Sequence, residues 1–261
     1  MNLSITIPAY NEEKRIGPTL KEYTTFFRKL KRQKQLDFEI IVVLNDCRDN
    51  TLSIVKEFEK KFKEIRHLEF KRSGKGFAIT EGFRDALKRK NDLIGFVDSD
   101  MSTSPETFYD LIVNINDNDG VIANRYDKNS IIYPKQQLMR RIVSRTGNLI
   151  IRTLFLFPYK DTQCGAKLFR KNVIQKLVDI IDLTEWAYDV NLLYLCRKYN
   201  FKIIDIPTKW ENKEGSMLKI NRVPLQFLLG VIRLRIIHSK IEPLARQLRF
   251  IAYLGDKIIN K

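Results

Sequence analysis

One stretch near the middle of the chain limits the possible folds more than any other. Residues 93–97, Leu-Ile-Gly-Phe-Val, form a short apolar run with polar neighbours on both sides, which predicts a buried central strand. Two carboxylates, Asp98 and Asp100, follow it, and their side chains point the same way if the backbone stays extended. In open α/β sheets, ligands bind at the carboxyl ends of strands. The pair therefore predicts a divalent-cation site, although it also suits a turn that begins a helix near Pro105.

Strand-like and helix-like segments alternate along the rest of the chain. This alternation predicts an α/β fold with a doubly wound, mainly parallel sheet flanked by helices. Further strands are expected at 3–7, 38–44, 64–70, 120–124 and 202–206. Helices are expected over 16–33, 105–116 and 171–181, and from 223 to the end, and two more are expected to end near residues 90 and 199. Residues 161–169 should lead into the helix at 171, and 208–216 should be a loop.

Polar and charged side chains follow several of the predicted strands. Asn11 and Glu12 come after the first strand, 45–49 after the second, and Lys75 lies between two glycines before a helix. Glycines let a backbone approach a ligand closely. Because parallel strands end at the same edge of a sheet, we expect these groups to lie near the acidic pair and to form a site for a metal-bound nucleotide.

The formal net charge of +16 indicates an anionic partner, which is nucleic acid, an anionic lipid surface or a phosphorylated substrate. Nucleic acid is disfavoured because acidic residues interleave with the basic ones and the aromatic residues form no stacking platform. Three widely spaced cysteines indicate a reduced, cytosolic setting. No signal segment or long apolar run is present, so we expect a soluble protein or one that lies on a membrane.

A basic amphipathic segment spans 134–157. Arg141, Arg145 and Arg152 fall near one helical face, and apolar residues fill the other. This segment either packs on the sheet with its arginines in solvent, or lies against a membrane interface or binds phosphate. Beyond it, basic and apolar residues alternate in a predicted helical extension at 221–261.

Several motifs together resemble a known family. They are Ile7-Pro8-Ala9-Tyr10-Asn11-Glu12, Val42 to Thr51, Gly74-Lys75-Gly76, Asp98-Ser99-Asp100 and Asp161-Thr162-Gln163-Cys164-Gly165. Their order is similar to that in family 2 glycosyltransferases of the GT-A fold, within which the chain looks like the dolichyl-phosphate β-glucosyltransferases and dolichol-phosphate mannose synthases. The resemblance covers about residues 1–220, which implies a catalytic domain there and an appended extension at 221–261.

The resemblance also implies roles for individual residues. Nucleotide contacts would come from Pro8, Tyr10, Glu12, Asn45 or Asp46, Lys75 and Asp98, whereas Asp98 and Asp100 would bind Mg²⁺ or Mn²⁺, with Asp100 as the main ligand. The acceptor phosphate would be held by Arg125 and by Arg140 or Arg141. Asp189 matches an aspartate near the family's active site, but a role in capping the start of a helix explains it equally well.

The reaction that the resemblance implies is the inverting transfer of a sugar from a nucleotide-sugar to a polyprenyl phosphate such as dolichyl phosphate. UDP-glucose is the favoured donor, and GDP-mannose and UDP-N-acetylglucosamine are alternatives. No general base is needed, because a phosphomonoester with a second pKa of about 6 is already ionised at neutral pH. A lipid acceptor implies peripheral attachment to the cytoplasmic face of a membrane, directly or through a membrane-protein partner.

Overall fold

A computed structural model describes residues 1–134, 138–181, 187–213 and 223–238, without the side chains of 138–140, 142 and 223–228. Within these residues the main sheet has seven strands in the order β3-β2-β1-β4-β7-β5-β8, and β6 and β9 form a separate ribbon. The main strands are β1 (Asn2–Ala9), β2 (Asp37–Asn45), β3 (Ile65–Phe70), β4 (Leu93–Val97), β5 (Gly120–Asn124), β7 (Ala166–Arg170) and β8 (Ile203–Pro207). The ribbon pairs β6 (Ile131–Tyr133) with β9 (Lys209–Glu211).

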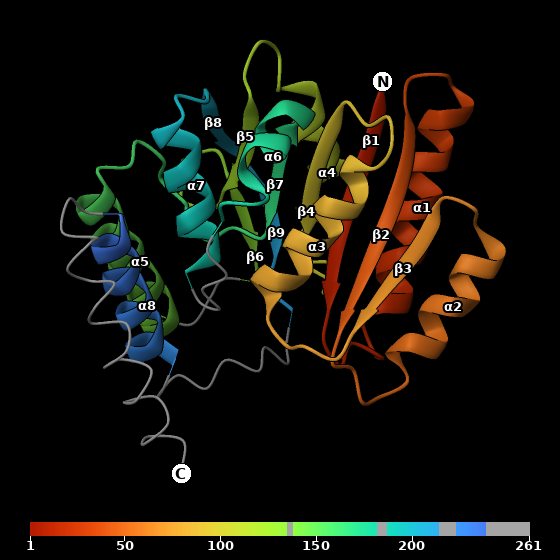
Figure 1. Cartoon of the computed structure of the whole chain (residues 1–261), viewed down its shortest axis with the longest axis horizontal. Helices are drawn as coiled ribbons and strands as arrows, with labels where there is room; N and C mark the ends of the chain where they lie inside the picture. The colour runs from red at the N-terminus through yellow and green to blue at the C-terminus, as the bar shows by residue number, and fades with distance from the viewer. Residues whose placement is uncertain (135–137, 182–186, 214–222, 239–261) are drawn as a thin grey trace.

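Helices cover both faces of the sheet (Figure 1). One face packs on α1 (Ile16–Arg32), α2 (Thr51–Lys61) and α4 (Pro105–Val113). The opposite face packs on α3 (Lys75–Leu87), α6 (Lys171–Leu177) and α7 (Tyr188–Lys198). A third apolar cluster joins α7 to α5 (Leu138–Phe155) and α8 (Val223–Ile237), which lie side by side at one end of the molecule.

The predicted fold class is confirmed, because parallel pairing joins β1 to β2, β2 to β3, β1 to β4 and β5 to β8. The predicted strands at 93–97 and 120–124 match β4 and β5 residue for residue. Both segments are fully buried, which is why they show as apolar runs bounded by polar residues. Figure 1 shows β1, β2 and β3 ending together at the lower edge of the sheet.

Residues 161–169 lead into α6 as expected, but Ala166–Arg170 forms β7, a strand that was not predicted from the sequence. This strand runs antiparallel between β4 and β5. Its second residue, Lys167, has no exposed surface. Strands that are buried on both faces usually show as continuous apolar runs, and the charged Lys167 breaks that pattern in β7. The loop expected at 208–216 likewise contains β9. The C-terminal helix is described only as far as Ile237, and the rest of the predicted extension lies outside the described residues.

Candidate active site

The loop after β1 holds Glu12 firmly and leaves Tyr10 open. The backbone N–H of Glu12 donates to the Thr51 hydroxyl at 2.7 Å, and Arg15 donates to its carboxylate through bonds of 2.5 and 2.7 Å. Burial raises the pKa of Glu12, and the hydrogen bond and charge of Arg15 only partly oppose this. Pro8 is buried within β1, whereas Tyr10 is 43% exposed. Of the two rings expected at the nucleotide, Tyr10 therefore offers the accessible surface.

Asn45 and Asp46, at the end of β2, have different environments. Asn45 is 3% exposed, and in the amide orientation that satisfies both neighbours it donates to the Ala9 carbonyl (2.5 Å) and accepts from the Gly74 N–H (3.2 Å). It thus links the end of β1 to the loop before α3. The Asp46 carboxylate is partly exposed and lies 3.2 Å from the Arg48 guanidinium. Of these two residues, Asp46 therefore has the side chain that reaches solvent.

The backbone adopts a left-handed conformation after three neighbouring strands. The φ angles are 52° at Asn11, 60° at Asp46 and 60° at Met101, which follow β1, β2 and β4. Asn and Asp tolerate this region, but for a residue such as Met it costs roughly 1–2 kcal/mol. The same conformation occurs at Lys34, Asn116 and Asn200, which precede β2, β5 and β8. These turns therefore shape the strand ends but do not by themselves mark a ligand site.

The end of β4 brings Asp98 against Lys75 and Gly165. The Lys75 ammonium at the start of α3 lies 2.5 Å from Asp98 Oδ1, and the Asp98 N–H donates to the Gly165 carbonyl at 3.2 Å. A Cβ at Gly165 would lie only 1.8 Å from Asp98 Oδ2, so only glycine leaves room for the carboxylate. Burial raises the pKa of Asp98 although the Lys75 charge opposes it. Burial disfavours the charged form of Lys75, but the negative charges of Asp98 and Asp189 overcome this and raise its pKa.

Asp100 completes the acidic pair, and the two carboxylates suit a divalent cation. Asp100 Oδ1 accepts a hydrogen bond from the Ser102 N–H at 2.9 Å, which orients the side chain in the turn after β4. Among the described residues no group of three or more His, Cys, Asp or Glu side chains could enclose a metal. Mg²⁺ in substrate complexes commonly takes one or two carboxylates and fills its other positions with phosphate oxygens and water. The residues present therefore fit a metal that is shared with a phosphorylated ligand.

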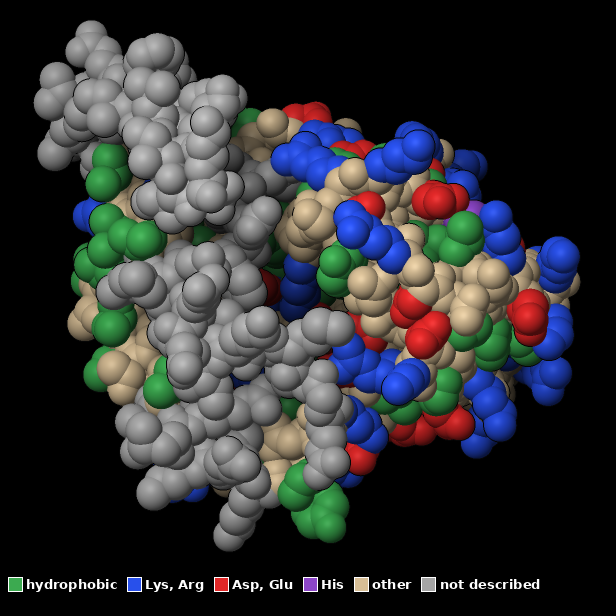
Figure 2. Space-filling view, turned by 90° about the horizontal axis from the view of Figure 1, so that it is seen from below, with side chains coloured by type: hydrophobic (Ala, Val, Ile, Leu, Met, Phe, Trp, Pro, Cys, Tyr) green, Lys and Arg blue, Asp and Glu red, His purple; other side chains and the backbone are tan. Residues whose placement is uncertain are grey.

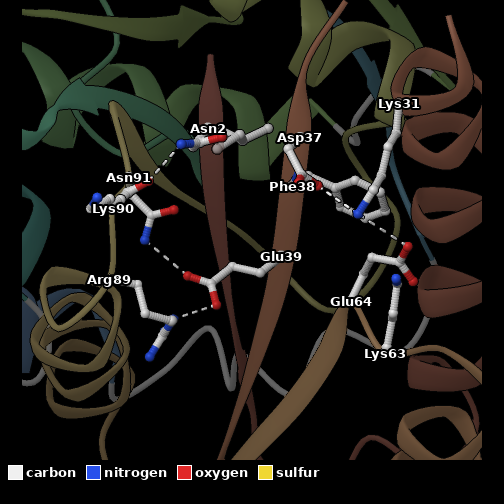
Figure 3. Close-up of a pocket in the computed structure, with 11 residues that line it drawn as sticks. Asn2, Lys31, Asp37, Phe38, Glu39, Lys63, Glu64, Arg89, Lys90 and Asn91 are labelled. Atoms are coloured by element: carbon white, nitrogen blue, oxygen red, sulfur yellow. Dashed lines mark hydrogen bonds and ion pairs between the residues drawn. The ribbon is translucent and has the colours of Figure 1, made fainter. Parts of the chain in front are cut away.

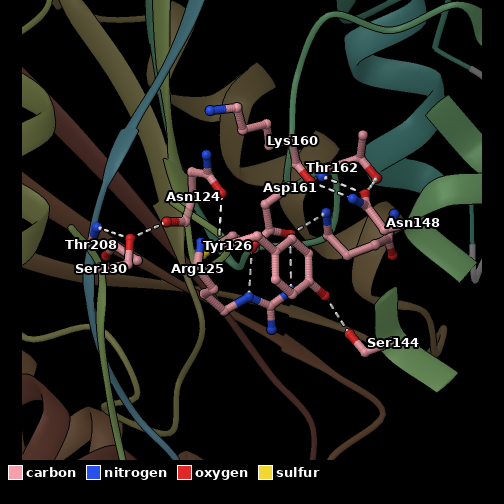
Figure 4. Close-up of polar contacts among 12 residues, drawn as sticks. Asn124, Arg125, Tyr126, Ser130, Ser144, Asn148, Lys160, Asp161, Thr162 and Thr208 are labelled. Carbon is pink, nitrogen blue, oxygen red and sulfur yellow. Dashed lines mark hydrogen bonds and ion pairs between the residues drawn. The ribbon is translucent and has the colours of Figure 1, made fainter. Parts of the chain in front are cut away.

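Arg125, which follows β5, is held by a buried carboxylate (Figure 4). Its Nε and Nη2 donate to Asp161 at 2.7 and 3.0 Å, and its backbone N–H donates to the same carboxylate at 3.0 Å. Its guanidinium carbon also lies 5.0 Å from the centre of the Trp210 ring. The charge of Arg125 keeps the pKa of Asp161 below its ordinary value, although burial would raise it. The arginine expected at the acceptor phosphate is thus already paired within the protein.

Helix α5 borders the same region. The hydroxyls of Tyr126 and Ser144 lie 2.5 Å apart, and the Arg145 guanidinium carbon is 5.8 Å from the centre of the Tyr126 ring. Arg141 is exposed one turn earlier on the helix. The side chain of Arg140 lies outside the described residues. Arg140 and Arg141 are the two candidates on this helix for the acceptor phosphate, and the structure describes the side chain of Arg141.

Asp189 lies in the first turn of α7, which begins after Ala187, and none of the described side chains caps this helix. The Asp189 carboxylate instead accepts a hydrogen bond from Lys167 at 2.5 Å. Lys167 also donates to the Cys164 carbonyl at 2.6 Å. Asp189 is thereby joined to the segment that packs beneath Asp98.

A cleft opens at the opposite edge of the sheet, near the amino ends of β1 and β2 (Figure 3). Its charged side chains largely engage one another. Glu39 accepts hydrogen bonds from Arg89 (2.6 Å) and Asn91 (2.9 Å), and Lys31 pairs with Asp37 at 2.6 Å. Asp98 and Asp100 lie at the other edge with partly exposed side chains, and that edge is therefore the candidate active site.

Sequence reasoning gave no role to three residues that shape this site, namely Asp161, Gly165 and Lys167. Asp161 and Arg125 are 36 positions apart, so no local periodicity connects them. The need for glycine at 165 arises only from the approach of Asp98. The one available signal was the motif Asp161-Thr162-Gln163-Cys164-Gly165, to whose residues the resemblance assigned no individual roles.

Comparison with solved structures shows the same fold. Glucosyl-3-phosphoglycerate synthase from Mycobacterium tuberculosis, solved with Mn²⁺, UDP and glucosyl-3-phosphoglycerate, superposes with a TM-score of 0.64 at 15% identity, over 92% of this chain and 81% of that one. Mannosyl-3-phosphoglycerate synthase from Rubrobacter xylanophilus gives 0.64 at 14% identity, over 90% and 74% of the two chains.

Curated relatives are similar over most of the sequence. A dolichyl-phosphate beta-glucosyltransferase of Dictyostelium discoideum is 29% identical over 89% of this chain and 73% of its own length. The Homo sapiens protein of the same name is 28% identical over 83% and 69%. The family model of glycosyl transferase family 2 matches residues 4–178. The protein is therefore a glycosyltransferase and belongs to glycosyl transferase family 2.

Proposed function

We propose that the protein transfers glucose from UDP-glucose to the phosphate of a dolichyl or similar polyprenyl phosphate, with inversion at the anomeric carbon. The observation that carries this proposal is the cluster at the end of β4, where Asp98, Asp100 and Lys75 are partly exposed at the edge of the sheet. Relatives named dolichyl-phosphate beta-glucosyltransferase support the choice of glucose and of the lipid acceptor.

We assign the donor site to the loops after β1, β2 and β4. Tyr10 and Asp46 offer exposed surface for the base, while Pro8, Glu12 and Asn45 shape the pocket behind them. Asp98 is placed to accept hydrogen bonds from the ribose. Lys75 is placed near the diphosphate, where a compact ammonium charge balances phosphate oxygens.

A metal in this site would be held by Asp100 and Asp98. When bound, Mg²⁺ or Mn²⁺ would stabilise the negative charge that develops on the leaving diphosphate. Structural neighbours with Mn²⁺ and UDP support this assignment. The protein itself must hold the donor so that the anomeric carbon faces the acceptor, which is the task of the fixed strand-end loops.

The acceptor phosphate needs cations more than it needs a base. It is mostly ionised at neutral pH, so the attacking oxygen carries no proton that must be removed. Arg141 is an exposed cation on the helix that borders the site, and Arg140 remains a candidate for the same task. Because Asp161 holds Arg125 through both oxygens, we propose that Arg125 fixes the wall of the acceptor site. Asp189 would face the substrates from the start of α7.

Helices α5 and α8 present apolar side chains to solvent, and we propose that this α5–α8 surface lies on a membrane. Its most exposed apolar residues are Val143, Leu149, Leu156, Leu229, Ile232 and Ile236, at 42–73%. Arginines 141, 145, 233 and 235 are exposed on the same helices. Figure 2 shows hydrophobic side chains at the end of the molecule where Figure 1 places α5 and α8. Apolar residues with flanking arginines match a lipid interface with anionic headgroups.

None of the helices in the described part of the chain is long and apolar enough to cross a membrane. We therefore propose peripheral attachment, on the cytoplasmic face because the three cysteines are free thiols, as a reducing compartment favours. The test is cosedimentation with vesicles of phosphatidylserine and phosphatidylcholine at low salt. The double variant Leu149→Glu/Leu229→Glu should lose most binding, while Val113→Glu, which alters an apolar residue 56% exposed on α4, should keep it. A wild-type protein that stays in the supernatant would contradict direct attachment and favour a membrane-protein partner.

We place the catalytic domain at residues 1–220 and treat 221–261 as its extension. The matched family region ends at residue 178, but α7 and β8 complete the described fold beyond it. The buried Val231 and Leu234 of α8 share an apolar cluster with α5, so the start of the extension packs on the domain. A chain that ends at residue 220 loses this contact, so it should unfold at a lower temperature and bind vesicles weakly.

The function is tested by transfer of radiolabelled sugar to dolichyl phosphate in detergent with Mg²⁺ or Mn²⁺. UDP-glucose should give lipid-soluble product, and Asp100→Ala should abolish it. Product from GDP-mannose or UDP-N-acetylglucosamine alone would replace glucose by that sugar. No product from any donor, with UDP binding intact, would contradict the proposed acceptor and leave the nucleotide site in place.

A further inference from the structure

Lys167 is a charged residue in the centre of the fold. It lies on β7 between β4 and β5, and none of its surface is exposed. Burying an ammonium group in this way is costly unless it is paired and hydrogen-bonded. Its charge is met by Asp189 Oδ1 at 2.5 Å and by the Cys164 carbonyl at 2.6 Å, and the Phe96 ring centre lies 5.4 Å away. These two acceptors come from different parts of the proposed active site.

The first acceptor, the Cys164 carbonyl, lies next to residues that we assign to the nucleotide-sugar site. Cys164 directly precedes Gly165, whose carbonyl accepts the Asp98 N–H and whose Cα faces the Asp98 carboxylate. A hydrogen bond to the Cys164 carbonyl therefore fixes the backbone against which Asp98 rests. Side chains one step removed from a metal or substrate ligand commonly set its orientation in this way.

The second acceptor leads to the start of α7. Asp189 is 11% exposed at its side chain, and one of its oxygens is held by Lys167. A Cβ added to Gly76 would lie 2.6 Å from the ring of Tyr188, the residue before Asp189. The starts of α7 and α3 are therefore in close contact. Movement of Asp189 would therefore also disturb the helix that carries Lys75.

We propose that Lys167 is a positioning residue that joins the Cys164–Gly165 backbone beneath Asp98 to the carboxylate of Asp189. The buried Lys167 ammonium thereby fixes the position of Asp98 relative to the start of α7. This inference rests on the proposed assignment of Asp98 to the nucleotide and of Asp189 to the substrates, and it adds a residue that touches neither.

The test separates the two contacts. Asp189→Asn keeps an oxygen for Lys167 and leaves the Cys164 contact intact, so UDP binding with Mn²⁺, measured by titration calorimetry, should stay close to that of the wild type. Lys167→Met/Asp189→Asn removes both charges, which avoids an unpaired buried ion and favours folding. Because its Cys164 contact is lost, UDP binding should weaken by about 10- to 100-fold. Both variants should transfer sugar slowly, through a lower kcat.

Arg89→Met is the matched control, because it removes two partly buried ion pairs, to Glu39 and Asp85, at the opposite edge of the sheet. It should lower the melting temperature without changing UDP affinity. If the double variant binds UDP as tightly as Asp189→Asn does, Lys167 is only a structural counter-ion and the proposal fails. A wild-type protein that binds UDP but transfers no glucose would contradict the proposed acceptor without affecting this comparison, whereas one that binds no UDP would overturn both.

Discussion

Ion pairs on the two sides of β4 are built alike but exposed differently. On the side toward β1–β3, which we call the donor side, Lys75 and Asp98 lie 2.5 Å apart with side chains 39% and 27% exposed. On the side toward β7 and β5, the framework side, Lys167 has no exposed surface. Asp161, paired with Arg125 at 2.7 Å, has none either. The donor side therefore keeps its charges within reach of a ligand.

This difference in exposure separates two tasks. A partly exposed ion pair is screened by solvent more than a fully buried one and contributes less to stability, so Lys75 can exchange Asp98 for a phosphate at a smaller cost to the fold. Removing one partner of a buried pair costs about 3–5 kcal/mol, because a charge is left without compensation. Substitutions on the donor side should therefore affect catalysis, and those on the framework side should affect stability as well.

The largest effect is expected from Asp100→Ala. Loss of this carboxylate should reduce transfer by about 10³-fold or more, because the charge on the leaving diphosphate is no longer offset. The melting temperature should change little, since Asp100 is partly exposed. Asp179→Ala, which removes a carboxylate that is 79% exposed after α6, serves as the control and should remain active. An unfolded Asp100→Ala protein would contradict the division between the two sides.

The comparison becomes sharper when a cation is removed from each side. Arg125→Met should lower the free energy of unfolding by about 3–5 kcal/mol, because Asp161 stays buried without its partner. Lys75→Met should lower it by less than Arg125→Met does, because this pair is partly exposed, while reducing transfer strongly. Urea unfolding followed by circular dichroism measures both changes. Equal losses of stability would show that exposure does not distinguish the two pairs.

Gly165→Ala tests the contact between the two sides. The new Cβ would lie 1.8 Å from Asp98 Oδ2, so the carboxylate must move. We expect transfer to fall by about 10- to 100-fold, with a parallel loss of UDP affinity in the presence of Mn²⁺. The control is Gly17→Ala in α1, where the nearest atom to the new Cβ is 3.6 Å away. This control should leave activity unchanged and raise stability by about 0.5–1 kcal/mol.

Sequence patterns predicted the donor side better than the framework side. The residues after β1, β2 and β4 follow apolar runs directly, so the rule that parallel strands end at one edge was sufficient to group them. The pattern did not distinguish Asn45 from Asp46, because both are polar residues at a strand end. Only the structure shows that Asn45 bonds to Ala9 and Gly74 and that Asp46 faces outward.

The framework side depends on contacts that leave no local trace in the sequence. Lys167 interrupts the apolar pattern of β7, and its partner Asp189 lies 22 positions later. The family resemblance implies a phosphate ligand for Arg125, but its partner Asp161 becomes apparent only when β5 and the segment before β7 are placed side by side. Buried ion pairs arise from tertiary packing, so composition and periodicity carry no signal for them.

The smallest effect concerns how the framework pair responds to pH. Burial alone would raise the pKa of Asp161, and Arg125 lowers it below the ordinary value. The stability that this carboxylate contributes is therefore present above pH 4 and is lost as the pH falls through the lowered pKa. In Arg125→Met the carboxylate remains buried without its cation, so its ionisation as the pH rises should destabilise the fold.

The difference in unfolding free energy between wild type and Arg125→Met should therefore widen from pH 4 to pH 7. Urea unfolding at several pH values measures this difference. Arg125→Met/Asp161→Asn lacks the titrating group, so its difference from wild type should stay nearly constant over the same range. If the difference between wild type and Arg125→Met is also constant, the guanidinium acts mainly through its shape and its packing on Trp210. A widening difference would show that charge compensation holds the framework side together and leaves the charges of the donor side free for the substrate.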